Sequence, residues 1–173
     1  KAERGIPFKK DLYGFIATKS LLLQKAGVEV RLNTEVTPEY CEIIKPDVLI
    51  IAVGAEPIIP PLPGIEGSNV IVANYVYENR DKIGSKVVVL GGGQVGCETA
   101  LHLAQEGKDV TVVEMLPEVC LDANARQRPL LLAQLDKFVS CRTNLRGVRV
   151  TETGLLCMAQ DGKEVLLEAD TVI

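Results

Sequence analysis

Hydrophobic positions in the first third of the chain follow a helical pattern and then two strand-like patterns. Apolar residues recur at helical spacing over residues 9–26, and Gly27 suits the left-handed stop just past a helix. Residues 28–32 alternate between apolar and charged positions, which predicts a strand with one buried face. A short helix is expected after Pro38, and the wholly apolar run 48–53 predicts a strand covered on both faces.

The middle of the chain alternates between strand and helix patterns. The expected order is a strand at 86–90, a helix closed by Gly107, a strand at 109–114, a helix at 123–138 started or kinked by Pro129, and a strand at 139–143. The buried stripe of the first of these helices is expected to consist of Val95, Thr99, Ala100, Leu103 and Ala104. A short strand at 70–73 and a short helix at 74–80 are expected before this region.

Near the C-terminus the pattern changes to that of an antiparallel meander. Asp161 and Gly162 form a tight-turn pair between two short apolar segments, 155–160 and 165–168. The last residues, 170–173, read as a further strand. The whole pattern predicts an α/β fold: a Rossmann-like, doubly wound parallel sheet with a C-terminal antiparallel β-meander.

Prolines mark the expected crossing between two domains. Four of the nine prolines fall within residues 57–63, where their fixed φ and missing N–H groups favour an extended, stiff connector. The chain begins on Lys1 and stops within an expected strand, so we expect a piece of a larger protein.

Charge and composition exclude several classes of function. The net charge is −4 at pH 7 and no basic cluster is present, which argues against a nucleic-acid partner. The apolar runs are too short to cross a membrane. No two of the five cysteines lie within four residues of each other, so no zinc or iron–sulfur motif is present. We expect reduced thiols in a cytoplasmic protein.

The glycine cluster at residues 91–96 is the strongest functional signal. It fits G-x-G-x-x-G, follows an apolar strand and opens a helix. Gly91 is expected to make the tight turn, Gly93 to admit a pyrophosphate to the backbone, and Gly96 to let the helix pack closely on the sheet. The main-chain amides and the helix dipole would hold the anion. The full set of residues expected here is Gly91, Gly92, Gly93, Gln94, Val95 and Gly96.

Glu114 favours NAD over NADP as the nucleotide. It ends the expected second strand, 23 residues after Gly91, where a carboxylate accepts hydrogen bonds from ribose hydroxyls and repels a 2′-phosphate. The next residue, Met115, begins a segment without an arginine that could receive that phosphate. FAD also binds such fingerprints, so an FAD site stays open as an alternative, as does a glycine turn without a ligand.

Other chemistries find little support in the sequence. His102 is the only histidine and lies within an expected helix, away from any nucleophile elbow, and no ATP-binding P-loop is present. Acids such as Asp122 and Asp136 are interpreted as solvated surface residues.

Two segments resemble a known family. The segment VVVLGGGQVGCETALHLA, with Glu98 two residues after the last glycine, resembles the NAD-binding domain of the pyridine nucleotide–disulfide oxidoreductase superfamily. VLIIAVGAEPIIPPLPGI is similar to the segment where the FAD domain of that superfamily passes to the NAD domain. The combination GCETA and VTVVEMLPE resembles the C-terminal region of the NADH:flavin oxidoreductase, 2,4-dienoyl-CoA reductase and enoate reductase group.

The resemblance implies a role in hydride transfer from NADH to FAD. Residues 1–64 would be part of an FAD-binding domain and residues 65–173 an NAD(H)-binding domain. Glu98 would lie near the nicotinamide and flavin, and Glu114 and Met115 near the adenosine ribose. The flavin side would be lined by Ala52, Val53, Gly54 and Ala55.

The sequence also departs from this family. The FAD fingerprint is missing, and no cysteine pair stands where a disulfide reductase keeps one. In the reductase subgroup an FMN barrel and iron–sulfur cysteines would lie upstream of Lys1. We therefore expect an NAD(H)-binding fragment that does not turn over alone. A non-catalytic NAD-sensing or interaction module is the alternative from another class.

Overall fold

The computed structural model describes residues 11–173, which form two compact units. The first extends to Glu56 and the second covers Pro57–Ile173. Each unit is described by itself.

Two helices are the regular elements of the first unit within the described residues. Helix α1 spans Asp11–Lys25 and is followed by Gly27 at φ +69°, so the helix and its glycine stop are confirmed. Positions 9 and 10 of the expected helix lie outside the described residues. Helix α2 spans Pro38–Ile44, and the Thr37 hydroxyl caps it by accepting a hydrogen bond from the amide of Tyr40 at 3.2 Å.

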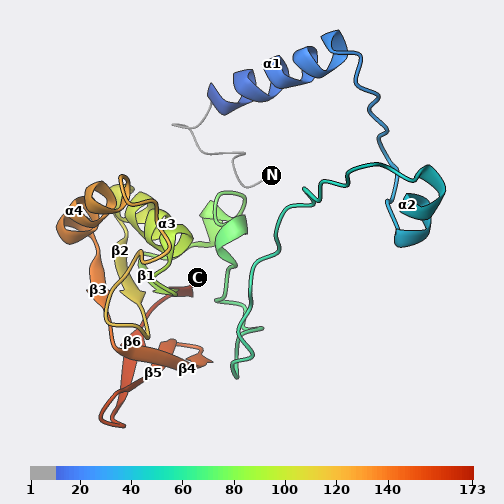
Figure 1. The fold of residues 1–173 in the computed structure, drawn as a ribbon. Coiled ribbons are helices and arrows are strands. Elements are labelled where there is room, and N and C mark those ends of the chain that lie inside the picture. The colour runs from blue at the N-terminus through green and yellow to red at the C-terminus, as the bar shows by residue number, and fades with distance from the viewer. Residues whose placement is uncertain (1–10) are drawn as a thin grey trace. The chain divides into compact units, whose positions relative to one another are not determined.

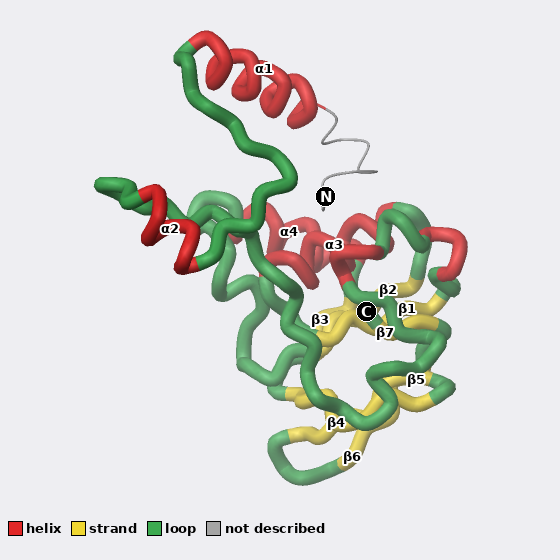
Figure 2. Tube along the Cα trace, turned by 90° about the vertical axis from the view of Figure 1, so that its right-hand side faces the viewer, coloured by secondary structure: helices red, strands yellow, loops and turns green. Residues whose placement is uncertain are grey.

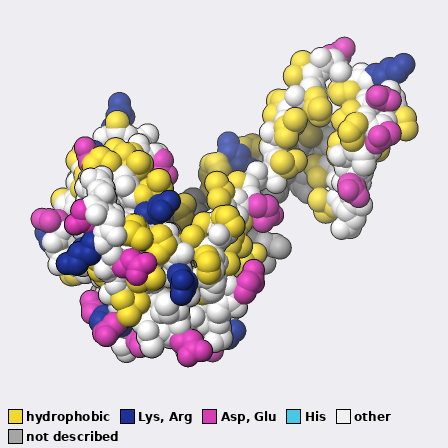
Figure 3. Space-filling model, turned by 90° about the horizontal axis from the view of Figure 1, so that it is seen from below, with side chains coloured by type: hydrophobic (Ala, Val, Ile, Leu, Met, Phe, Trp, Pro, Cys, Tyr) yellow, Lys and Arg dark blue, Asp and Glu magenta, His cyan; other side chains and the backbone are white. Residues whose placement is uncertain are grey.

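The strands expected at 28–32 and 48–53 do not form, and this part of the prediction is wrong. Both segments are extended but unpaired. Their apolar side chains face solvent, with Ile50 83% and Val53 90% exposed. Hydrophobic patches are visible on the surface in Figure 3. A strand needs a neighbour for its backbone hydrogen bonds, and the described residues provide none for these segments.

A parallel four-stranded sheet forms the centre of the second unit (Figure 1). Its order is β3-β2-β1-β7. The strands are β1 (Lys86–Leu90), β2 (Asp109–Val113), β3 (Ser140–Arg142) and β7 (Thr171–Val172), and the helices between them are α3 (Gln94–Gln105) and α4 (Arg128–Phe138). The expected α/β fold and its parallel sheet are confirmed.

The expected meander is also confirmed. Strands β4 (Leu145–Thr151), β5 (Gly154–Ala159) and β6 (Glu164–Glu168) form an antiparallel sheet in that order. Gly162 has φ +82° in the turn between β5 and β6, a conformation that favours glycine.

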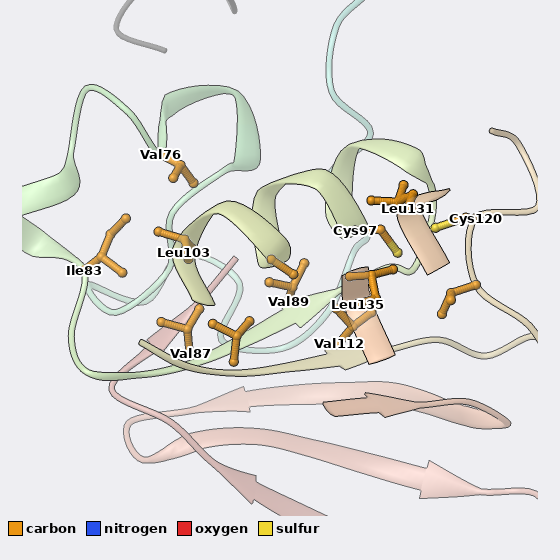
Figure 4. Packing of buried hydrophobic residues seen from close by; sticks show 13 residues of the cluster. Val76, Ile83, Val87, Val89, Cys97, Leu103, Val112, Cys120, Leu131 and Leu135 are labelled. Carbon is orange, nitrogen blue, oxygen red and sulfur yellow. The ribbon is translucent and has the colours of Figure 1, made fainter. Parts of the chain in front are cut away.

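Strand β1 sends alternate side chains into two separate cores. Val87 and Val89 pack with α3 and α4, as Figure 4 shows, whereas Val88 packs with the β4-β5-β6 sheet. The parallel sheet is therefore covered by helices on one face and by the meander on the other (Figure 2). Covering both faces explains why all three valines are 1% exposed.

Several element boundaries differ from the prediction. Helix α4 begins at Arg128 rather than near residue 123, because Pro129 suits the first turn of a helix. Only Val70 of the segment 70–73 pairs, in one bridge to Val172, and the helix expected at 74–80 is replaced by 3₁₀ turns at Ala73–Tyr75 and Arg80–Lys82. In α3, Val95 is exposed and Cys97 is buried in its place.

Candidate functional site

The glycine loop, residues 91–96, comprises the turn after β1 and the first residues of α3, at the carboxyl end of the parallel sheet. Strand β1 lies between β2, which follows it through α3, and β7, which comes from the end of the chain. The direction of strand order therefore changes at β1. In open α/β sheets, ligands bind beyond the carboxyl strand ends at such a position.

Two glycines give this loop its shape. Gly91 has φ +109°, a conformation that side chains rarely allow, and it turns the chain out of β1. A Cβ atom on Gly96 would overlap the carbonyl oxygen of Gly91. Only a residue without a side chain therefore lets the first turn of α3 lie this close to the end of β1.

Glu114 follows the last residue of β2 and holds the glycine loop directly. Its Oε2 accepts a hydrogen bond from the Gly92 amide at 2.7 Å, and its Oε1 accepts one from the Leu116 amide at 2.8 Å. The carboxylate is half-buried and faces the loop, whereas the side chain of Met115 is exposed. The structure therefore brings Glu114 to the glycine loop, as the spacing in the sequence indicates.

Asp122 is exposed, as expected for a surface acid, but its carboxylate also contacts the glycine loop. Its Oδ1 accepts a hydrogen bond from the amide of Gln94, the first residue of α3, at 2.8 Å. Its Oδ2 lies 3.2 Å from the position that a Cβ on Gly93 would take. The carboxylate thus lies against the face of Gly93 and the amino end of the helix, where the helix dipole stabilises negative charge.

Glu98 belongs to a polar cluster with two glutamines. Its Oε1 accepts a hydrogen bond from Gln94 Nε2 at 2.9 Å and one from Gln127 Nε2 at 2.7 Å. Gln127 carries no signal in the sequence for this contact, because it lies 29 positions from Glu98 and follows no motif spacing. The two amides orient the Glu98 carboxylate beside the first turn of α3.

Cys120, in the segment between β2 and α4, is hydrogen-bonded to the glycine loop. The Cys120 amide donates a hydrogen bond to the Gly92 carbonyl at 2.7 Å, and Cys97 Sγ donates to the same oxygen at 3.3 Å. Arg128 Nε donates to the Cys120 carbonyl at 3.0 Å. Figure 4 shows Cys97 and Cys120 at the same end of the helical core.

Burial makes both of these thiols poor nucleophiles. It raises the pKa of Cys97 far above its usual range, and it also raises the pKa of Cys120. Neither cysteine is therefore a candidate for thiolate chemistry, and their contribution to the site is packing.

The residues expected on the flavin side lie in the other unit. Ala52, Val53, Gly54 and Ala55 are exposed in an extended segment, and Gly54 has φ +84°. A hollow beside α4 is lined by Val119, Leu132, Ala133, Leu135, Asp136, Val139 and Cys141, so none of the expected cofactor residues lines it. Residues 11–173 contain no group of side chains suited to a metal ion, and none of their helices is long and apolar enough to span a membrane.

Comparison with protein families decides the classification. The model of the pyridine nucleotide-disulphide oxidoreductase family matches residues 29–173. The chain belongs to this family. Its members are oxidoreductases, and the family implies flavin and pyridine nucleotide cofactors.

Similar proteins include reductases and an oxidase. The chain is 34% identical to an NADH oxidase of Thermoanaerobacter brockii, over 87% of this chain and 24% of that protein. It is 30% identical to a cinnamate reductase of Clostridium sporogenes, over 98% of this chain and 26% of that protein. The present family member thus spans about a quarter of the length of these relatives.

A solved structure of a similar protein confirms the fold of this chain. A 2-naphthoyl-CoA reductase in complex with 2-naphthoyl-CoA matches 99% of this chain and 26% of its own, with a TM-score of 0.77 and 31% identity. The match supports the α/β architecture with its parallel and antiparallel sheets.

The glycine loop has three features that dinucleotide-binding loops use. It offers a tight turn at Gly91, a close helix–strand contact at Gly96 and amides at the start of a 12-residue helix. The carboxylates of Glu114 and Asp122 lie at the same loop.

Proposed function

We propose that the chain is the NAD(H)-binding part of a flavin-dependent oxidoreductase and positions NADH for hydride transfer to FAD. The observation that carries this proposal is the glycine loop at the carboxyl end of β1, with Glu114 at the end of the adjacent parallel strand. In such folds a diphosphate binds at the amino end of the helix and a carboxylate after the second strand binds the ribose.

Each part of the loop has a role in this proposal. Gly91, Gly92, Gly93, Gln94, Val95 and Gly96 would hold the diphosphate. Glu114 would keep its hydrogen bonds from the Gly92 and Leu116 amides and use its remaining lone pairs to accept a hydrogen bond from a ribose hydroxyl, next to Met115. Its charge would disfavour a 2′-phosphate.

Glu98 would lie on the nicotinamide side, held in place by Gln94 and Gln127. The nicotinamide and flavin supply the hydride chemistry, while the protein binds and orients them. We further propose that residues 1–64 belong to the FAD-binding part, with Ala52, Val53, Gly54 and Ala55 on the flavin side, and that residues 65–173 bind NAD(H). The whole enzyme would include further FAD-binding segments and, as in the reductase subgroup, FMN and an iron–sulfur cluster.

Titration of the chain with NADH, NADPH and FAD tests the proposed ligand. Fluorescence or calorimetry should show saturable NADH binding, at least about tenfold tighter than NADPH binding, because Glu114 repels the 2′-phosphate. A preference for NADPH would contradict the role of Glu114. Saturable FAD binding that competes with NADH would instead identify the glycine loop as an FAD site.

The variant Gly93→Val tests whether the glycine loop is the site. Gly93 has φ −68°, so its backbone tolerates a side chain, but the added methyl groups would fill the space beside the amides. We expect a folded variant whose NADH affinity falls by about two orders of magnitude, since the diphosphate contacts are lost. The control Gly14→Val adds the same side chain at a position with nothing within 4 Å. Unchanged NADH affinity in folded Gly93→Val would contradict the proposal.

A further inference from the structure

The amino end of α3 already carries a negative group from the chain itself. The Asp122 carboxylate accepts a hydrogen bond from the Gln94 amide at 2.8 Å. Both of its oxygens also lie within 3.5 Å of the Cβ position of Gly93. Under the proposed function, the diphosphate binds at this same Gln94 amide and on this same face of Gly93.

We propose that Asp122 is a built-in competitor of the cofactor: its carboxylate occupies the diphosphate position in the ligand-free chain and must leave before a dinucleotide binds. This inference rests on the proposed function for the identity of the ligand. Two anionic groups cannot share one amide donor and one end of a helix dipole without strong repulsion. The cofactor's net affinity is therefore its intrinsic affinity reduced by the stability of the Asp122 contact.

The surrounding segment allows Asp122 to move while its base stays fixed. Val119 and Cys120 are buried, and Arg128 donates hydrogen bonds to both of their carbonyl oxygens, at 3.1 Å from Val119 and 3.0 Å from Cys120. Asp122 itself is exposed, so its side chain can turn from the Gln94 amide into water. The hydrogen bond between Asp122 and the Gln94 amide can therefore break and re-form while the backbone at Val119 and Cys120 stays in place.

The charge balance near the loop supports this role. Glu114 already accepts a hydrogen bond from the Gly92 amide, and Glu98 accepts hydrogen bonds from the side chains of Gln94 and Gln127. The nearby guanidinium of Arg128 is paired with Glu118 at 2.5 Å. The three carboxylates of Glu98, Glu114 and Asp122 thus surround the first turn of α3, and Asp122 is the one that bonds to a helix amide.

Removing the Asp122 carboxylate should strengthen anion binding. The probes are inorganic pyrophosphate and NADH, measured by calorimetry on the full 173-residue chain and on Asp122→Ala, Asp122→Asn and Asp161→Ala. We expect Asp122→Ala to bind both probes about tenfold more tightly than the unaltered chain, since a competing charge-assisted contact is lost. Asp122→Asn should lie between the two, because an amide oxygen can still accept the hydrogen bond but carries no charge.

Asp161→Ala is the matched control. It removes another exposed carboxylate that accepts a backbone hydrogen bond, from the Lys163 amide at 3.0 Å, in the turn between β5 and β6. Its affinities should equal those of the unaltered chain. The Gln94 amide resonance in an NMR spectrum gives a second measure: pyrophosphate should shift it at lower concentration in Asp122→Ala.

The outcomes separate this inference from the proposed function. Tighter pyrophosphate binding by Asp122→Ala without NADH binding by any variant would support the competing carboxylate and refute the nicotinamide assignment. NADH binding that is equal or weaker in Asp122→Ala would overturn the inference and leave the proposed function standing. Binding of neither probe by any variant would overturn both.

Discussion

The Glu114 carboxylate and the Gly92 amide are joined by a hydrogen bond of 2.7 Å across 22 residues of sequence. Through this bond, the residue proposed to select the nucleotide also shapes the loop proposed to hold its diphosphate. Gly92 is buried, so removing the carboxylate would leave its amide without a hydrogen-bond partner in the chain.

Two substitutions at Glu114 should separate its structural role from its role in selectivity. Glu114→Ala leaves the Gly92 amide without its acceptor and should lower the free energy of unfolding by about 1–3 kcal/mol. Glu114→Gln keeps an acceptor oxygen and most of that stability, but loses the charge that repels a 2′-phosphate. Both variants should bind NADH and NADPH with similar affinity, whereas Glu164→Ala, an exposed acid on β6, should change neither property. A folded Glu114→Gln that keeps its NADH preference would refute the charge argument.

Gly96→Ala should destabilise the second unit. The new Cβ would overlap the Gly91 carbonyl oxygen, and because both groups belong to the backbone, the helix itself must move. We expect the free energy of unfolding to fall by about 1–3 kcal/mol, measured by urea denaturation. Gly14→Ala provides the comparison, since nothing lies within 4 Å of that position and alanine favours helix α1. An unchanged urea midpoint for Gly96→Ala would contradict the close helix–strand contact.

Cys157 should resist thiol reagents until the fold opens. Burial on β5 raises its pKa to about 11, so about one thousandth is thiolate at pH 8. The folded state then binds more protons than the unfolded state between about pH 9 and 11, and stability should fall as the pH rises through that range. Labelling followed by mass spectrometry should modify the exposed Cys141 and the partly exposed Cys41 before Cys157. Rapid labelling of native Cys157 at pH 8 would contradict this prediction.

The second unit was largely predictable because its strands and helices are buried in periodic patterns. Strand β1 is apolar from Val87 to Leu90 since both of its faces are covered, and Gly107 follows α3 in a left-handed conformation. The hairpin of β5 and β6 follows from the turn chemistry of Asp161 and Gly162. In each case the signal lies within a few residues, and the structure agrees.

Features that depend on distant residues were either predicted wrongly or missed. The segments 28–32 and 48–53 have strand patterns, but pairing requires a neighbouring strand that the described residues do not supply. The contact of Asp122 with the Gln94 amide depends on the path of the chain after β2, including the left-handed conformation of Cys120 at φ +57°. No local pattern in the sequence signals that path.

The alternation of side chains along β1 has a mechanical consequence. Since Val88 and Val89 are embedded in different layers, the strand that ends at the glycine loop cannot shift without disturbing both layers. Any molecule held at the end of this strand would therefore also slow the opening of the β5–β6 hairpin. A ligand bound at the glycine loop would thus stabilise the β5–β6 hairpin through strand β1.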